Sequence, residues 1–264
     1  MPQSLYRSFN QQHDAGAALY MPLTALRENK IAFRKGQVGM INGAPGGGKS
    51  TLILNIIINT PKVPVLYLSP DSDIMTLGPR MVAIADKVPL SQVESELDKG
   101  GESRARVLEK TKQFSHIQWS FKTSPSFENI IEELEDYETV HGYFPEMIVL
   151  DNIRDVYSDE VGEGGEHQRF SATVDFFADL AESLNIAVVL LHHLKGQYEN
   201  GDVPPPLSAL LGNVSKQARM VLNLFDVSDS EMGIVPAKLS NGRAYRTASH
   251  WHTVLWNKET QVIT

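Results

Sequence analysis

One glycine-rich stretch near the start of the chain limits the possible folds more than any other feature. It reads Gly43-Ala44-Pro45-Gly46-Gly47-Gly48-Lys49-Ser50 and matches the phosphate-loop pattern G-x-x-x-x-G-K-[ST] at every fixed position. An apolar run at residues 37–41 precedes it, and another at residues 51–58 follows it. A strand, a loop and a helix in this order are the context that a phosphate loop requires. The alternative is a glycine-rich turn before an ordinary helix.

The residue types in this stretch predict phosphate binding. Residues without a side chain let successive backbone N–H groups turn inward on an anion, and the start of the following helix adds its dipole. Lys49 is then expected to reach the β- and γ-phosphates, and the hydroxyl of Ser50 to hold Mg²⁺. We therefore expect residues 43–50, together with Thr51, to bind ATP with Mg²⁺.

Length and composition favour one globular domain away from the membrane. A chain of 264 residues can bury a sizeable core, and no apolar run approaches the ~20 residues needed to span a bilayer. The chain has no cysteine, which suits a reducing cytoplasm, and its amino terminus has no apolar signal core. The net charge of −8 argues against a surface that binds nucleic acid everywhere, although a local basic lining remains compatible with it.

From residue 36 onward, apolar runs of strand length alternate with segments of helical spacing. The expected strands are residues 37–41, 63–68, 117–121, 147–150 and 186–191, and the expected helices are residues 51–58, 74–88, 126–139 and 168–184, with two short helices between residues 90 and 113. Strands that are apolar throughout suit a sheet covered on both faces, so we predict a doubly wound, largely parallel α/β sheet. Turn residues after position 221 predict an antiparallel edge.

The polar amino terminus is expected to stand apart from this domain. Residues 1–33 are interpreted as an arm that packs on a neighbouring subunit, with a frayed or self-packed terminus as the alternative. Residues 34–264 are expected to form the ATPase domain.

Acidic residues follow two of the expected strands, at the edge where open α/β sheets bind ligands. Asp151 ends the run at residues 147–150, where its carboxylate can hold the Mg²⁺ shell; a helix or turn cap is the alternative. Asp71 and Asp73 follow a strand that we expect next to the phosphate loop in the sheet. One of them, with Asp71 favoured, can orient and deprotonate the attacking water, although both also suit a turn and a cap.

A histidine pair ends the fifth expected strand. His192 and His193 are a weak metal pair, because adjacent residues on a strand point to opposite faces. His193 can sense the γ-phosphate and pass its presence to the following loop. A hydrogen-bonded structural histidine is the alternative.

Taken in order, these motifs resemble the RecA-like ATPase core. Residues 43–51, 66–71, 147–152 and 190–196 follow the order and spacing of that core in hexameric replicative helicases of the DnaB type and plasmid helicases of the RepA type. The resemblance covers roughly residues 34–256. The amino-terminal domain of the family, which recruits primase in DnaB, is expected to be absent, which would leave the motor core alone.

The resemblance implies roles for individual residues. Asp71 matches the general base, Asp151 the Mg²⁺ aspartate, and His193 a polar sensor that is glutamine in many relatives. Arg80 matches an arginine on the helix after the base. The base is aspartate where the family has glutamate, so its side chain is one methylene shorter.

The resemblance also implies a DNA partner and a ring. Residues 161–167 and 197–207 match the two DNA-binding loops, but both carry acidic side chains and little basic charge. Backbone amides of glycine-rich loops can still hold phosphates. The implied partners are single-stranded or branched DNA and further copies of the chain, arranged as a hexameric ring.

One stretch departs from the family pattern. Lys238-Leu239-Ser240-Asn241-Gly242 resembles the K-x-R-x-G stretch by which a neighbouring subunit completes the nucleotide site, but Ser240 stands where the arginine finger would be. We expect Lys238 and Arg243 of a neighbour to bind the nucleotide, with Arg246 or Arg219 as alternative sources of the charge, or slow hydrolysis. An arginine finger contributes about 10³–10⁵ in rate.

The sequence therefore favours a nucleic-acid-dependent ATP hydrolase of DNA replication, recombination or repair, a ring-forming helicase or translocase motor core. A second hypothesis is a RecA-like nuclease for flap or branched DNA, with a divalent metal held by Asp151, Asp155 and Asp159. A third is an ATP-gated assembly or loading protein without motor activity, which the missing finger and the short base would suit.

Overall fold

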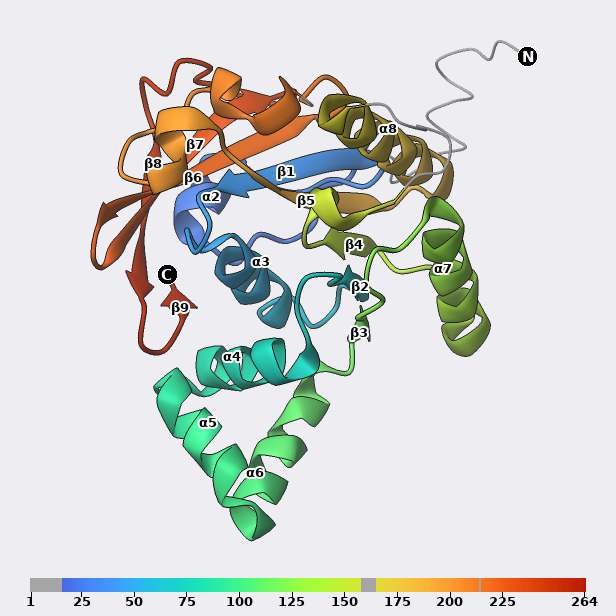
Figure 1. The fold of residues 1–264 in the computed structure, drawn as a ribbon, viewed down its shortest axis with the longest axis vertical. Helices are drawn as coiled ribbons and strands as arrows, with labels where there is room; N and C mark the ends of the chain where they lie inside the picture. Colours follow the sequence, from blue (N-terminus) through green and yellow to red (C-terminus); the bar gives the residue numbers. More distant parts are fainter. Residues whose placement is uncertain (1–15, 158–164, 214) are drawn as a thin grey trace.

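A nine-stranded sheet in the order β3-β2-β4-β5-β1-β6-β7-β8-β9 runs through the part of the chain that the computed structural model describes, residues 16–157, 165–213 and 215–264 (Figure 1). The strands are β1 (Gln37–Gly43), β2 (Val65–Leu68), β3 (Ile117–Ser120), β4 (Met147–Leu150), β5 (Ala187–His193), β6 (Met220–Ser228), β7 (Glu231–Leu239), β8 (His252–Asn257) and β9 (Val262–Ile263).

Helices cover both faces of this sheet, as the apolar strands predicted. The α-helices are α2 (Thr24–Glu28), α3 (Lys49–Ile58), α4 (Ile74–Asp86), α5 (Leu90–Lys99), α6 (Gly101–Thr111), α7 (Phe127–His141) and α8 (Glu166–Leu184). Side chains of α3 to α6 pack in one apolar core, and those of α7 and α8 pack in a second core on the other face. Figure 1 shows α4, α5 and α6 grouped at the lower end of the molecule.

Short 3-10 helices connect several of these elements: η1 (Lys112–Phe114), η2 (Ile153–Asp155), η4 (Gly196–Asn200), η5 (Leu207–Ala209) and η6 (Leu211–Asn213). Among the described residues, no helix combines the length and the apolar character that crossing a bilayer demands.

The six strands β3, β2, β4, β5, β1 and β6 are neighbours in the sheet and run parallel. The loops that follow them therefore lie together at the carboxyl ends of the strands. β1 pairs with β5 and β6, and β4 pairs with β2 and β5, all in parallel register. The prediction of a doubly wound, largely parallel sheet is confirmed. The expectation that β2 lies next to the phosphate-loop strand is wrong, because β4 and β5 separate β2 from β1.

The antiparallel edge predicted after residue 221 is also confirmed. β6 pairs with β7, β7 with β8, and β8 with β9, all antiparallel. A turn at residues 258–261 joins β8 to β9, and another at residues 240–241 follows the end of β7. At the end of this series, β9 and the carboxyl terminus lie beside α3 (Figure 1).

The described part of the amino-terminal segment packs into the main core. Leu19, Leu26 and Phe33 are all buried there, and the Leu19 N–H donates to the carbonyl of Phe33. The packing is therefore continuous across the boundary expected at residue 33. Residues 1–15 lie outside the described residues, so an arm that packs on a neighbouring subunit stays a prediction for them.

Local signals explain why several helices begin and end where they do. Gly100 separates α5 from α6, and Gly101 begins α6; both glycines are at positive φ. Ser126 caps α7 with Asn129 as its partner: the two side chains each accept a hydrogen bond from the other residue's backbone N–H. This reciprocal arrangement is a capping box, which satisfies two N–H groups that the first turn leaves free.

We predict that removing this cap destabilises the fold measurably. Ser126→Ala leaves the Asn129 N–H without its acceptor, so the free energy of unfolding should fall by about 1 kcal/mol. Urea denaturation followed by circular dichroism measures this change. Ser183→Ala, at an exposed position inside α8, is the matched control and should stay within about 0.5 kcal/mol of the wild type. Equal stability of the two variants would contradict the capping argument.

Candidate active site

The phosphate-loop sequence folds into the strand-loop-helix arrangement that its pattern predicts. β1 ends at Gly43 and α3 begins at Lys49. Gly46 and Gly48 adopt φ values of 72° and 80°, which favour glycine, and a β-carbon on Gly47 would lie 3.1 Å from the carbonyl oxygen of Ala44. No side chain caps the start of α3 and no acidic residue lies in its first turn. Its N–H groups and the helix dipole therefore favour an anion.

Lys49 lies inside this loop with its ammonium group held by the backbone. Its Nζ atom donates to the carbonyl oxygens of Gly43 and Ala44, at 3.2 and 2.9 Å. Burial lowers the pKa of Lys49 from 10.5 to about 8, although the nearby carboxylates of Asp151 and Asp71 act to raise it. Among the described residues, the ammonium group therefore has only backbone carbonyls as hydrogen-bond partners, and it lies near the positive end of α3. A polyphosphate bound there would supply negative charge.

Asp151 meets Ser50 directly, although 101 positions separate them in the sequence. The Ser50 hydroxyl donates to Oδ2 of Asp151 at 2.6 Å, and the Tyr67 hydroxyl donates to the same oxygen at 2.9 Å. Burial raises the pKa of Asp151, while these two hydrogen bonds and the charge of Lys49 act to lower it. A hydroxyl and a carboxylate oxygen at this separation are ligands that Mg²⁺ prefers, so the side chains fit the predicted metal.

Tyr67 is a site residue that the sequence analysis missed. Its side chain is fully buried in β2, and burial together with Asp151 raises the pKa of its hydroxyl. A tyrosine in an otherwise aliphatic strand is the one available signal, because a buried hydroxyl needs a hydrogen-bond partner.

The two acidic residues after β2 have different surroundings. Asp73 is the N-cap of α4, where its side chain accepts a hydrogen bond from the N–H of Thr76 at 2.8 Å. Asp71 is exposed, and its charge acts on the pKa of Lys49 and of Asp151. Asp71 therefore lies within electrostatic reach of Lys49 and Asp151, and Asp73 caps α4.

His192 and His193 point to different surroundings, as their position in a strand predicted. His192 is fully buried, and burial lowers its pKa to about 4. Its Nε2 atom lies 3.0 Å from the carbonyl oxygen of Leu211, a contact that acts to raise the pKa. His193 is partly buried at the end of β5, and burial, Lys49 and Arg154 lower its pKa. Lys49 acts on the pKa of both histidines, and His193 is the less buried member of the pair.

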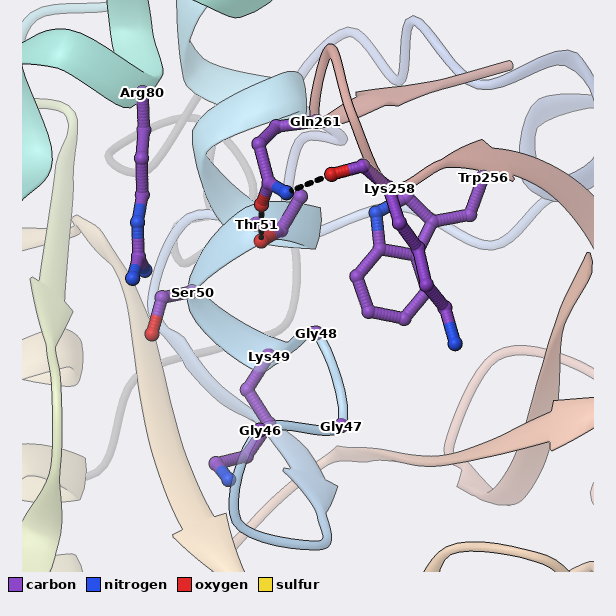
Figure 2. A pocket seen from close by; sticks show the side chains of 10 residues that line it. All are labelled: Gly46, Gly47, Gly48, Lys49, Ser50, Thr51, Arg80, Trp256, Lys258 and Gln261. Atoms are coloured by element: carbon purple, nitrogen blue, oxygen red, sulfur yellow. Dashed lines mark hydrogen bonds between the residues drawn. The ribbon is translucent and has the colours of Figure 1, made fainter. Parts of the chain in front are cut away.

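Arg80 faces the phosphate loop from α4. It lines a pocket of about 410 Å³ with residues 46–51, and Figure 2 shows its guanidinium group extending from α4 toward Ser50. Three further residues of this pocket come from the carboxyl-terminal strands and their turn: Trp256, Lys258 and Gln261. No motif in the sequence marks these three residues.

Lys238 and the phosphate loop of its own chain lie at opposite ends of the sheet's strands. Lys238 pairs with Val221, near the start of β6, whereas the phosphate loop follows the end of the parallel strand β1. Its ammonium group donates to the carbonyl oxygens of Ser215 and Lys216. Burial, Arg219 and Arg246 lower its pKa.

The alternative arginines differ in their relation to Lys238. Arg246 lines the same pocket of about 460 Å³ as Lys238, and Arg219 acts on the pKa of Lys238. The guanidinium group of Arg243 instead lies over the Tyr245 ring, 5.2 Å from its centroid. Ser240 is exposed beside them, with its N–H bonded to the carbonyl of Arg219.

The second expected DNA loop, residues 197–207, packs against the phosphate loop at Ala44. A β-carbon on Gly201 would lie 3.2 Å from the β-carbon of Ala44. Asn42, at the end of β1, donates to the side chain of Asn223 at 2.9 Å, and Asn223 donates to the carbonyls of Pro205 and Pro206. Buried hydrogen bonds therefore join the strand before the phosphate loop to the end of this second loop.

Parts of two sequence hypotheses fall on residues that the structure does not describe. Residues 158–164 lie outside the described ranges, and they include most of the first expected DNA loop and Asp159 of the nuclease hypothesis. Burial, Asp71 and Asp151 raise the pKa of Asp155. Within the described residues, no group of three or more His, Asp or Glu side chains is arranged to hold a metal ion.

Comparisons with known proteins identify relatives of this chain. The family model for the DnaB-like helicase C terminal domain matches residues 21–242. The chain is 31% identical over 227 residues to the Gene 65 protein of Mycobacterium phage L5, covering 86% of this chain and 82% of that protein. It is 32% identical over 193 residues to the Gene 65 protein of Mycobacterium phage D29, covering 72% and 81%.

Two solved structures share the fold. A DnaB-like replicative helicase, described with its interactions with primase, matches with a TM-score of 0.81 at 15% identity over 98% of this chain. The chain spans 64% of the length of that helicase. A second structure, described as an ATPase domain, matches with a TM-score of 0.80 at 14% identity, covering 98% of this chain and 95% of that domain.

We predict that nucleotide affinity falls as the pH rises through 8. The pKa of Lys49 is about 8, so its ammonium form is complete well below pH 8 and decreases about tenfold per pH unit well above it. The dissociation constant for ATP should therefore rise by about fivefold between pH 8 and 9, as measured by titration calorimetry. Lys49→Arg keeps its charge over this range, so its affinity should not vary with pH. Constant affinity of the wild type from pH 7 to 9.5 would contradict the assignment.

Proposed function

The chain belongs to the DnaB-like helicase C-terminal domain family, the ATP-hydrolysing motors of replicative helicases, and we propose that it couples ATP hydrolysis to movement along single-stranded DNA. The observation that carries the proposal is the contact between Ser50 and Asp151 beside Lys49. Three residue types that phosphoryl transfer requires meet there at the carboxyl edge of a parallel sheet.

The residues have separate tasks in this proposal. Lys49 and the loop amides bind the β- and γ-phosphates, and Ser50 and Asp151 hold Mg²⁺, which neutralises charge on phosphate oxygens when it is bound. Tyr67 orients the Asp151 carboxylate through its hydrogen bond. Asp71, which is exposed beside the phosphate loop, accepts the proton of the attacking water. His193 senses the γ-phosphate, and Arg80 contributes positive charge from α4.

The proposal includes a ring of identical subunits, with six as the expected number, acting on DNA in the cytoplasm. Its support is the position of Lys238 at the sheet edge away from its own phosphate loop, with Arg246 lining the same pocket. A head-to-tail contact between copies would bring this edge of one subunit to the phosphate loop of the next. We propose that Lys238 acts there with one of the nearby arginines, and we favour Arg246 over Arg243 because Arg246 shares its pocket.

We predict that hydrolysis depends on Lys49 and Asp71 and is stimulated by single-stranded DNA. Lys49→Ala should abolish ATP turnover, and Asp71→Asn should reduce it about 10²–10⁴-fold, because the variant side chain cannot accept the proton. Phosphate release, measured with and without single-stranded DNA, tests both variants. Lys62→Ala and Asp229→Asn, at exposed positions, are the matched controls and should keep wild-type turnover. Turnover retained by Lys49→Ala would remove the phosphate loop from the mechanism.

We predict that Lys238 acts on the nucleotide of a neighbouring subunit. Lys49→Ala and Lys238→Ala should each be inactive alone, whereas an equal mixture should recover about one quarter of the wild-type rate, because random head-to-tail assembly leaves that share of interfaces intact. Phosphate release from the mixture measures the recovery. In parallel, Arg246→Ala should lose more activity than Arg243→Ala. A mixture that remains inactive would contradict action between subunits.

A further inference from the structure

Acidic residues are missing from one long segment of this acidic chain. Residues 232–258, which run from β7 to the turn after β8, contain no aspartate or glutamate, although the net charge of the chain is −8. Their basic side chains are Lys238, Arg243, Arg246 and Lys258. Such a segment attracts phosphate locally, because phosphate contacts depend on where Lys and Arg lie rather than on the net charge. Residues 243–258 also lie beyond residue 242, where the match to the family model ends, so the family relationship assigns them no role.

Aromatic side chains are interleaved with the basic ones in the connection between β7 and β8. Residues 243–252 contain two arginines, two histidines, a tyrosine and a tryptophan. The guanidinium group of Arg243 lies 5.2 Å from the centroid of the Tyr245 ring. The rings of Tyr245 and His250 are 4.8 Å apart, and those of His250 and His252 are 5.4 Å apart. These four side chains, Arg243, Tyr245, His250 and His252, therefore form one continuous aromatic row.

The aromatic row is open to solvent. Arg243 and His250 are exposed, and Tyr245 and His252 are partly buried. Trp251, the neighbour of His250 in the sequence, is 37% exposed, and its ring packs edge-on against Phe225 with the centroids 5.3 Å apart. Rings and a guanidinium plane that stay accessible in the folded chain can stack on a further planar group. The row therefore offers a surface for a planar ligand.

Backbone hydrogen bonds fix the aromatic row beside the second expected DNA loop, residues 197–207. The N–H of Tyr245 donates to the carbonyl of Pro236 in β7. The N–H of Leu207, at the end of the loop, donates to the carbonyl of Arg246. The loop therefore ends next to the residue that follows Tyr245 in the row.

The loop itself lacks the positive charge that a nucleic-acid strand attracts. The charged side chains within residues 197–207 are Glu199 and Asp202. Arg243 and Arg246, both exposed, lie beyond its end. A strand that leaves the loop in this direction meets positive charge and aromatic rings together, the combination by which proteins bind single-stranded nucleic acid. A duplex keeps its bases stacked on one another, so a stacking surface of this kind selects a single strand.

We propose that the aromatic row binds the bases of single-stranded DNA by stacking where the strand leaves the loop at residues 197–207. Tyr245 and His250 supply the ring faces, and Arg243 holds the Tyr245 ring and attracts the phosphate backbone. This inference rests on the proposed function, which supplies single-stranded DNA as the ligand. It goes beyond that function by placing a base contact outside both expected DNA loops and outside the family match.

Fluorescence anisotropy with two labelled probes tests the aromatic row: a deoxythymidine oligonucleotide and a strand of the same length made only of abasic sites. Tyr245→Ala and His250→Ala should each weaken binding of the thymidine strand about tenfold, because each removes one stacking surface. Binding of the abasic strand, which has no base to stack, should stay within about twofold of the wild type. Tyr143→Ala, at an exposed tyrosine after α7, is the matched control and should bind both probes as the wild type does.

Two further variants separate stacking from charge. Tyr245→Phe keeps the ring, so its affinity for the thymidine strand should stay within about twofold of the wild type. Arg243→Ala should weaken binding of both probes and lower the salt dependence by about one phosphate contact, whereas Arg104→Ala, exposed on α6, should change neither. Backbone atoms make the hydrogen bonds that fix the segment, so these substitutions leave them in place.

Three results would contradict the inference, and they differ in what they say of the proposed function. Wild-type affinity of Tyr245→Ala and His250→Ala for the thymidine strand, or an equal loss for both probes, would overturn this inference alone. So would a change in oligomeric mass of Tyr245→Ala, measured by light scattering, with unchanged DNA affinity, because the row would then join copies of the chain. Wild-type protein that binds no single-stranded DNA would overturn the proposed function and this inference together.

Discussion

The hydrogen bond between Ser50 and Asp151 holds the two halves of the site together. It joins the start of α3 to the end of β4, although β5 lies between β4 and the phosphate-loop strand β1 in the sheet. Parallel strands make this contact possible, because the loops that follow them emerge along one edge. The apolar cores on both faces hold β1, β5 and β4 in register, so the precision of a polar contact of 2.6 Å rests on buried aliphatic packing.

Burial strengthens the interactions of these polar groups with a ligand, but it also costs desolvation free energy. Lys49 and Asp151 are both buried. Burial lowers the pKa of Lys49 and raises the pKa of Asp151, and each shift favours the neutral form of the side chain. Hydrogen bonds from Ser50 and Tyr67, and from Lys49 to the loop carbonyls, offset part of this desolvation. A site arranged in this way has strong interactions available for a charged ligand, because water does not screen them.

The phosphate loop and Lys238 lie at opposite ends of the strands. The phosphate loop and the acidic residues lie at the carboxyl edge of the parallel strands, whereas Lys238 lies near the start of β6 at the other edge. A chain built in this way cannot bring Lys238 to its own loop without unfolding the sheet, which is why we relate the two edges through neighbouring copies. The buried pair Asn42 and Asn223 links the carboxyl edge to the second expected DNA loop, so the same sheet connects nucleotide binding with the loop that we assign to DNA.

Local patterns in the sequence were enough to predict the parallel α/β sheet, the phosphate loop and the aspartate after β4: apolar runs, glycines at fixed spacing, and a carboxylate directly after a strand. Packing between distant segments was needed to establish that β4 and β5 separate β2 from β1, that Asp73 caps α4, and that Tyr67 contacts Asp151. The same packing brought Trp256, Lys258 and Gln261 to the pocket. Strand order and the path of the carboxyl terminus arise from contacts between segments far apart in the chain, and such contacts leave no periodic or spaced signal in the residues themselves.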